Sequence, residues 1–136
     1  MAEPASDRRA TEEDVTRAQI YGLLAGLLAA PADASTLKSL AQLPGDESQL
    51  GQALGALSRV AAGARDTDVA REYHDLFIGV GRGELLPYAS YYLTGFLNEK
   101  PLAKLRGRMA ELGIERDPSV KEPEDHVAAV MDMMAG

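Results

Sequence analysis

Apolar residues that recur every three or four positions, in stretches bounded by proline or glycine, are the feature that most constrains this fold. The longest stretch extends from Thr11, a candidate N-cap with Asp14 three residues on, to about Ala30. Pro31 follows and ends the pattern, because proline cannot continue a helix. One face of this predicted first helix carries its larger apolar residues: Ile20, Leu23, Leu24, Leu27 and Leu28.

The same spacing predicts further helices, with turns or loops between them. We expect helices over about 35–43, 48–62, 66–77, 87–97 and 101–112, and a last one from Pro123, with a loop at 79–86. Leu112 is expected to face inward from the helix over 101–112, and Met134 belongs to the apolar stripe of the last helix. Alanine and leucine are abundant and β-branched residues are few, which favours helices over strands. The predicted fold class is all-α: a disordered tail of residues 1–10, then one helical domain of about seven helices over 11–136.

Composition limits the classes of function. The 136 residues include 14 Lys and Arg and 21 Asp and Glu, which gives a formal net charge of −7. This balance disfavours nucleic-acid binding and suits a basic partner. Cysteine is absent, which excludes disulfides, thiolate catalysis and cysteine-ligated metal sites and is in keeping with a cytoplasmic protein.

Two arginines and an apolar run near the N-terminus resemble a secretory signal or a membrane span. The apolar run from Ile20 to Ala30 is shorter than the about 20 residues that a helix needs to span a bilayer. Acidic residues separate Arg8 and Arg9 from this run, which argues against a secretory signal. We therefore expect a core helix here and no membrane span.

Two other patterns have ordinary structural explanations. The spacing Gly79-x-Gly81-x-Gly83 follows a helix and lacks the arrangement of a phosphate-binding loop, so a flexible interhelical loop is favoured. His74 lies beside an apolar helical face and is interpreted as a partly buried or surface histidine.

A third pattern, near the C-terminal end of the sequence, leaves two interpretations open. Glu122, Asp125 and His126 lie within five residues at a predicted helix start, where Glu122 and His126 are spaced i, i+4 and can face each other. An acidic helix cap with a solvated histidine is the favoured interpretation. With one further ligand, the alternative is a small metal- or nucleotide-binding enzyme centred on these three residues.

Three blocks of sequence, taken in order, resemble the TorD/DmsD/NarJ family of redox-enzyme maturation chaperones. The blocks are Glu72-Tyr73-His74-Asp75-Leu76-Phe77-Ile78-Gly79, Pro87-Tyr88-Ala89-Ser90-Tyr91-Tyr92 and Glu122-Pro123-Glu124-Asp125-His126. The resemblance implies a cytoplasmic, all-helical protein that is not an enzyme. It implies binding to the twin-arginine signal peptide, and to the apo form, of a molybdenum-cofactor oxidoreductase. It implies no resident cofactor, although guanine nucleotide has been linked to the family.

The family's binding residues correspond to a set of positions in this sequence. They are Tyr73, Phe77, Pro87, Tyr88, Ser90, Tyr92, Asp125 and His126, to which we add Glu122 from the same motif. Physical chemistry is compatible with this role, because two arginines can form charge-assisted bonds to carboxylates such as Glu122, Glu124 and Asp125. Tyr88, Tyr92 and Phe77 are expected to line an apolar groove for the stretch that follows the arginines.

The resemblance also implies further helices after the E-P-x-D-H block. The chain is therefore expected to be a C-terminally short member or a fragment, which leaves Met131 and Met134 without partners. A homodimer, with or without exchanged helices, is one way to complete such a core. A helical regulatory scaffold that binds no signal peptide is the remaining alternative.

Overall fold

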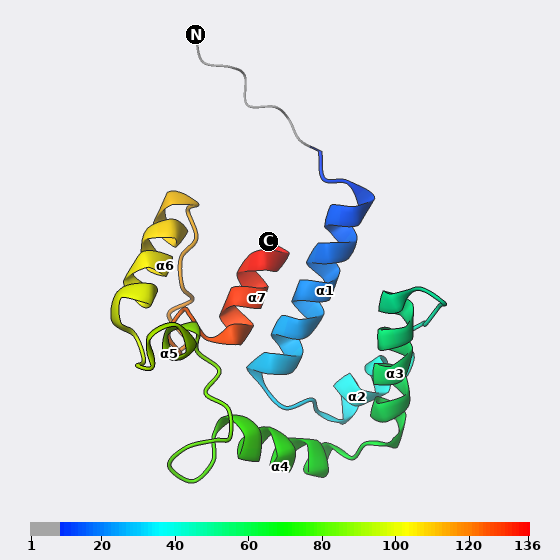
Figure 1. The fold of residues 1–136 in the computed structure, drawn as a ribbon. Coiled ribbons are helices and arrows are strands. Elements are labelled where there is room, and N and C mark those ends of the chain that lie inside the picture. Colours follow the sequence, from blue (N-terminus) through cyan, green and yellow to red (C-terminus); the bar gives the residue numbers. More distant parts are fainter. Residues whose placement is uncertain (1–8) are drawn as a thin grey trace.

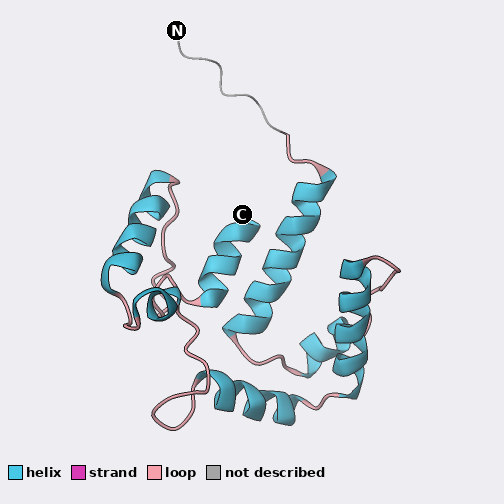
Figure 2. Cartoon of the chain, in the orientation of Figure 1, coloured by secondary structure: helices cyan, strands magenta, loops and turns pink. Residues whose placement is uncertain are grey.

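The computed structural model describes residues 9–136, which form seven α-helices and no strand (Figures 1 and 2). The helices are α1 (Glu12–Ala29), α2 (Ala34–Leu40), α3 (Gln49–Gly63), α4 (Asp66–Phe77), α5 (Ala89–Thr94), α6 (Glu99–Glu111) and α7 (Val127–Ala135). The all-α prediction is therefore confirmed. Most of the predicted disordered tail, residues 1–8, lies outside the described residues, while Arg9 and Ala10 are exposed and non-helical.

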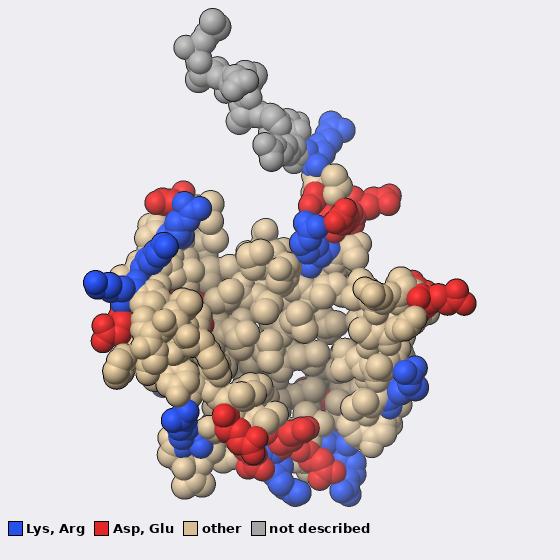
Figure 3. Space-filling model, viewed as in Figure 1, with Lys and Arg blue, Asp and Glu red and all other residues tan. Residues whose placement is uncertain are grey.

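Helices α1 and α7 lie side by side and antiparallel at the centre of the molecule (Figure 1). Helices α2 and α3 pack together on one side of this pair, and α5 and α6 on the other, while α4 connects the two sides. The chain thus leaves α1, passes through both peripheral pairs and returns with α7. In the view of Figure 3, charged side chains lie mainly around the periphery, and uncharged residues occupy the central area. None of the helices within residues 9–136 has the length and apolar character needed to cross a membrane.

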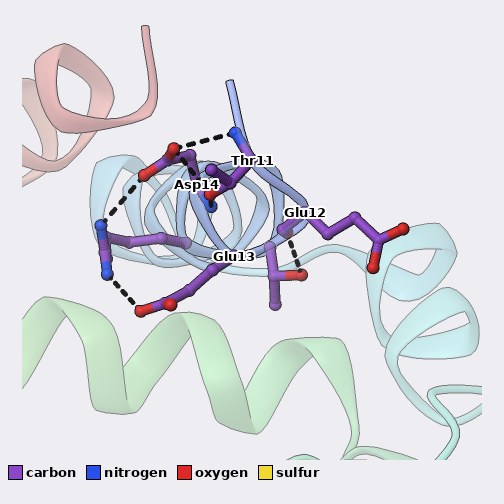
Figure 4. Close-up of polar contacts among 6 residues, drawn as sticks. Thr11, Glu12, Glu13 and Asp14 are labelled. Atoms are coloured by element: carbon purple, nitrogen blue, oxygen red, sulfur yellow. Dashed lines mark hydrogen bonds and ion pairs between the residues drawn. The ribbon is translucent and has the colours of Figure 1, made fainter. Parts of the chain in front are cut away.

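The first three helices begin at local side-chain caps. The Thr11 hydroxyl accepts from the Asp14 amide, and the Asp14 carboxylate accepts from the Thr11 amide, which is the predicted capping box (Figure 4). Asp33 caps α2 by accepting from the Thr36 amide at 2.7 Å, and Ser48 caps α3 in the same way. Each cap satisfies backbone donors that the first helical turn leaves without a partner.

Buried apolar side chains lie on both sides of the central helices. On one side Leu37, Leu40 and Ala61 are buried, with partly buried side chains from α1, α3 and α4 packed around them. A second buried set comes from α1, α6 and α7: Ala25, Leu102, Met109 and Ala128. Because these residues leave water, their burial supplies the main driving force for bringing the helices together.

The prediction for the helix after Pro87 is wrong in its extent. Tyr88 is extended and precedes α5, and Gly95 ends the helix by adopting a left-handed backbone with φ of 81°. Tyr88 and Phe96 therefore lie outside the helix that carries Tyr92. Tyr92 and Phe96 are 64% and 69% exposed.

The prediction for the last helix is also wrong in its start. Residues 123–126 form a turn in which the His126 amide donates to the Pro123 carbonyl at 3.0 Å, and α7 begins only at Val127. Leu112, predicted to face inward, is the C-cap of α6 and is 69% exposed because it lies past the last packed turn. Met134, a member of the predicted apolar stripe that is expected to lack partners, is 54% exposed near the end of α7.

Candidate functional site

A groove of about 820 Å³ opens between α1, α7 and the segment that joins α6 to α7. Small residues of the two helices line it over much of its length: Gly22, Ala25, Gly26 and Ala29 from α1, with Ala128 and Ala129 from α7. Six of the nine predicted site residues also line it: Tyr73, Phe77, Pro87, Tyr88, Glu122 and His126. The fold thus brings parts of all three sequence blocks to one concave surface.

Two of these blocks, far apart in the sequence, are joined by backbone hydrogen bonds. The Ala89 amide donates to the Asp125 carbonyl at 3.1 Å, and the Val127 amide donates to the Pro87 carbonyl at 2.8 Å. These bonds pair Tyr88 with His126 as an isolated antiparallel bridge. We call residues 87–90 and 122–127 the bridge region.

Ser90 and Asp125 hold the bridge region from inside rather than lining the groove. Ser90 is fully buried and Asp125 is 2% exposed. The Asp125 Oδ2 accepts from the Ser90 amide at 2.8 Å, and the Ser90 Oγ accepts from the Asn98 amide at 3.0 Å. Within the described residues the Asp125 Oδ1 is buried without a hydrogen-bond partner. The site's buried carboxylate therefore serves to orient the backbone.

Tyr88 sits at the centre of the groove-facing part of the bridge region. Its hydroxyl donates to the Glu122 Oε2, and its ring meets the His126 ring edge-on with centroids 5.2 Å apart. Burial, followed by the hydrogen bond to Glu122, raises the pKa of Tyr88 well above its ordinary value, so the phenol remains a donor. The Glu122 carboxylate is thereby held in a defined position at the groove.

His126 caps α7 as a neutral side chain. Its Nδ1 accepts from the Ala128 amide at 3.1 Å, which requires that this nitrogen carry no proton. Burial lowers the pKa of His126, while the charges of Glu122 and Asp125 act in the opposite direction.

The end of α4 supplies the aromatic part of the groove. Tyr73 and Phe77 pack edge-to-face with ring centroids 4.9 Å apart, and the Tyr73 hydroxyl donates to the Leu28 carbonyl at 2.8 Å. Burial raises the pKa of Tyr73, with a further contribution from Glu122. The bond to Leu28 ties α4 to the last turn of α1, so the aromatic wall is fixed to the central helices.

Three sequence expectations about the site need correction. Tyr92 does not line the groove, because α5 turns it outward against Tyr91. Glu122 and His126 do not face each other across a helical turn, because residues 122–126 are not helical; each contacts Tyr88 instead. The expectation that Glu124 is available to a ligand is not met. Glu124 forms a two-bond ion pair with Arg106 at 3.0 Å, which lowers the pKa of Glu124.

The metal-site alternative finds no arrangement to support it in residues 9–136. No group of three or more His, Asp or Glu side chains in this part of the chain is placed to hold a metal ion. Glu122 contacts Tyr88, Asp125 contacts the Ser90 amide and His126 contacts the Ala128 amide, so the three groups have separate partners.

The glycine-rich segment and His74 have the structural roles expected of them. Gly79 and Gly81 adopt positive φ in the loop between α4 and α5, and the Leu85 amide donates to the Leu76 carbonyl at 2.7 Å. This hydrogen-bonded loop leads directly into Pro87. The His74 side chain is half exposed beside Asp75.

Sequence reasoning missed the groove residues that lie outside the three blocks. They include the charged residues Glu115, Arg116, Asp117 and Asp132. A single aspartate within the apolar stretch Val127–Ala135 was the visible signal for Asp132. The small residues of α1 recur at helical spacing, which was the corresponding signal for its close approach to α7.

Comparisons with known proteins identify a family and several relatives that this chain resembles. The family model described as nitrate reductase delta subunit matches residues 43–136. The chain is 36% identical over 69 residues to the chaperone protein TorD of Vibrio parahaemolyticus, a match that covers 49% of this chain and 32% of that one. It is 29% identical over 134 residues to the chaperone protein TorD of Aliivibrio fischeri, covering 87% of this chain and 62% of that one. The chain thus spans less than two thirds of the length of these relatives.

A solved structure shares the fold. It comes from Archaeoglobus fulgidus and is assigned as a redox enzyme maturation protein. The two superpose with a TM-score of 0.62 at 16% identity, covering 96% of this chain and 75% of that one.

Proposed function

The chain belongs to the nitrate reductase delta subunit family, that is, to the TorD/DmsD/NarJ chaperones, and from this premise we propose that it is a redox-enzyme maturation chaperone. Members of this family are chaperones and not enzymes. In this proposal the chain works in the cytoplasm, where it binds the twin-arginine signal peptide of a molybdenum-cofactor oxidoreductase. It keeps that enzyme from export until its cofactor has been inserted.

One observation carries the proposal: an apolar groove whose lining also includes several carboxylates. Arg116 is the one guanidinium in the lining, whereas the carboxylate residues there are Glu115, Asp117, Glu122, Asp132 and Glu124, the last of which is paired with Arg106. A twin-arginine signal peptide is complementary to this surface, because it joins two cations to an apolar stretch. The net charge of −7 favours the approach of such a cationic segment.

Glu122 is the carboxylate of the bridge region that is best placed for an arginine. Glu124 is paired with Arg106, and Asp125 is buried, whereas Glu122 lines the groove and contacts only the Tyr88 hydroxyl among the described residues. Tyr88 occupies Oε2, which leaves Oε1 for a guanidinium. A neutral tyrosine donor that fixes a carboxylate reduces the freedom lost on binding.

The aromatic wall suits the apolar stretch that follows the arginines. Tyr73 and Phe77 supply large apolar area with few rotatable bonds, and Pro87 adds a rigid surface beside them. The proposal places the peptide in the groove of one chain. It also includes no role for guanine nucleotide.

Calorimetric titration with a synthetic twin-arginine signal peptide tests the proposal. We expect saturable binding that weakens when both arginines are replaced by lysine, because lysine cannot form two parallel bonds to one carboxylate. Absence of binding by the folded protein would overturn the proposal and favour a regulatory scaffold. Adding GDP is expected to leave the affinity unchanged.

A matched pair of variants separates the groove from the rest of the surface. Phe77→Ala removes an aromatic side chain from the groove, and Tyr92→Ala removes one that points outward. We expect Phe77→Ala to weaken peptide binding about tenfold or more and Tyr92→Ala to leave it within twofold, on the scale of buried and peripheral contacts. Equal losses would place the peptide elsewhere than in the groove.

A further inference from the structure

Asp132 is an unusual residue in its own helix. It is the only charged residue of α7, whose other members between Val127 and Ala135 are all apolar. Aspartate is a poor helix former, so it adds nothing to helix stability by propensity. Within residues 9–136 its side chain has no hydrogen-bond or ion-pair partner, yet it lines the groove beside Ala128, Ala129 and Met133. Its side chain is exposed at the groove, where a ligand can reach it.

The other groove carboxylates differ from Asp132 in what they already bind or in how firmly they are held. Asp117 accepts from the Ser119 amide and hydroxyl at 2.8 and 2.7 Å, and Glu124 is engaged by Arg106. Glu115 belongs to the irregular segment between α6 and α7, whereas Asp132 is mounted on a helix that packs along α1. A charge on a packed helix offers a better-defined position for recognition than one on a loop.

We propose that Asp132 is the second arginine-reading position of the groove, with Glu122 as the first. This inference rests on the proposed function, because it assigns the two cations of the signal peptide to two separate carboxylates. Neighbouring side chains of an extended peptide point to opposite sides, so one carboxylate cannot serve both guanidinium groups. Six residues of helix separate His126 from Asp132, a rise of about 9 Å along the groove from the bridge region.

The surroundings of Asp132 favour an arginine over other cations. A guanidinium can form two parallel hydrogen bonds with one carboxylate, and its weak hydration eases transfer to an apolar surface. Within residues 9–136 the Asp132 carboxylate has no hydrogen-bond or ion-pair partner, and Arg116 is the one guanidinium that lines the same groove. The peptide arginine is thus the partner that this position lacks.

Titration of the full chain with four peptides tests the assignment. The peptides carry Arg-Arg, Arg-Lys, Lys-Arg or Lys-Lys at the twin position and are otherwise identical. They are titrated into the unaltered protein, Asp132→Asn, Glu122→Gln and the control Glu111→Gln, whose residue pairs with Arg108 on α6 and does not line the groove. Asp132→Asn keeps the side-chain shape, and its melting temperature is measured alongside.

The expected result is a pattern of paired losses. Asp132→Asn lowers affinity for the Arg-Arg peptide about tenfold, the scale of one charge-assisted pair, and no longer distinguishes arginine from lysine at one of the two positions. Glu122→Gln does the same at the other position, and Glu111→Gln changes nothing.

Two results would overturn the inference in different ways. If the unaltered protein prefers Arg-Arg and Asp132→Asn keeps that preference in full, the assignment of Asp132 is wrong while the proposed function stands. If the unaltered protein binds none of the peptides, the proposed function fails and this assignment fails with it.

Discussion

The two sides of this molecule are stabilised by different kinds of interaction. Around α2 and α3 the buried residues with apolar side chains are Leu37, Leu40 and Ala61, and most side-chain hydrogen bonds join residues no more than five positions apart. In the bridge region the buried residues are Ser90, Asp125 and His126. There the defining contacts join residues 34 and 35 positions apart, Tyr88 to Glu122 and Ser90 to Asp125.

This difference predicts opposite responses to substitution. Apolar burial has no direction, so the α2–α3 side should tolerate changes that preserve volume and respond to changes that remove it. Hydrogen bonds depend on donor and acceptor, so the bridge region should respond to the loss of one oxygen even when volume is nearly preserved. The groove lies against the second kind of structure, which gives its walls fixed positions.

The largest expected effect is on the apolar side. Leu40→Ala removes a side chain that is 5% exposed in the packed cluster and is expected to cost about 3 kcal/mol of unfolding free energy. Leu40→Met, which nearly preserves volume, is expected to cost about 1 kcal/mol. Urea denaturation measures both. Equal costs for the two variants would contradict the view that volume dominates this side.

The next largest effect is on the bridge region. Asp125→Ala leaves the buried Ser90 amide without its acceptor and is expected to cost about 2 kcal/mol, again by urea denaturation. Asp125→Asn retains an oxygen for that amide and should cost clearly less. If both cost the same, the charge of Asp125 rather than its hydrogen bond would hold the bridge region.

The contrast between the two sides also explains what the sequence could predict. Helix starts at Thr11, Ser48 and Asp66 follow from caps and periodicity, which are properties of neighbouring residues. The start of α7 is not such a property. His126 caps it because residues 87–90 hold residues 125–127 in a bridge, and no periodic pattern encodes a contact over that distance.

The same contrast between local patterns and contacts of distant residues applies to the residues of the candidate site. Resemblance to a family indicated Tyr73, Phe77 and Tyr88, the same motif added Glu122, and these four residues line the groove. It could not distinguish a residue that faces the groove from one that supports it, and Asp125 supports it from a buried position. The resemblance also indicated Tyr92, which lies outside the groove because the short helix α5 leaves it exposed.

A smaller effect is expected at Ser90, which sharpens the role of side-chain oxygens in the bridge region. Ser90→Ala removes the acceptor of the Asn98 amide, at a junction where Asn98 and Glu99 both adopt positive φ. Loss of this bond is expected to cost about 1 kcal/mol. Thermal unfolding of Ser90→Ala beside Ser39→Ala, an exposed serine of α2, provides the comparison. A larger loss for Ser39→Ala would contradict the special role of the buried serine.

The smallest expected effect is a pH dependence between pH 8 and pH 5 that arises at His126 in the bridge region. Burial lowers the pKa of His126, opposed by the charges of Glu122 and Asp125, so the folded pKa lies below the unfolded value of about 6.5. The contribution of neutral His126 to stability is therefore complete above about pH 6.5 and is lost as pH falls through the folded pKa. Protonation at Nδ1 would also remove the acceptor for the Ala128 amide.

His126→Asn retains a capping side chain that does not titrate. Unfolding free energies measured from pH 8 to pH 5 should thus fall more steeply for the unaltered protein than for His126→Asn. Parallel curves would mean that His126 is held by packing against Tyr88 rather than by its hydrogen bond, and the two sides of the molecule would then be more alike than their buried residues indicate.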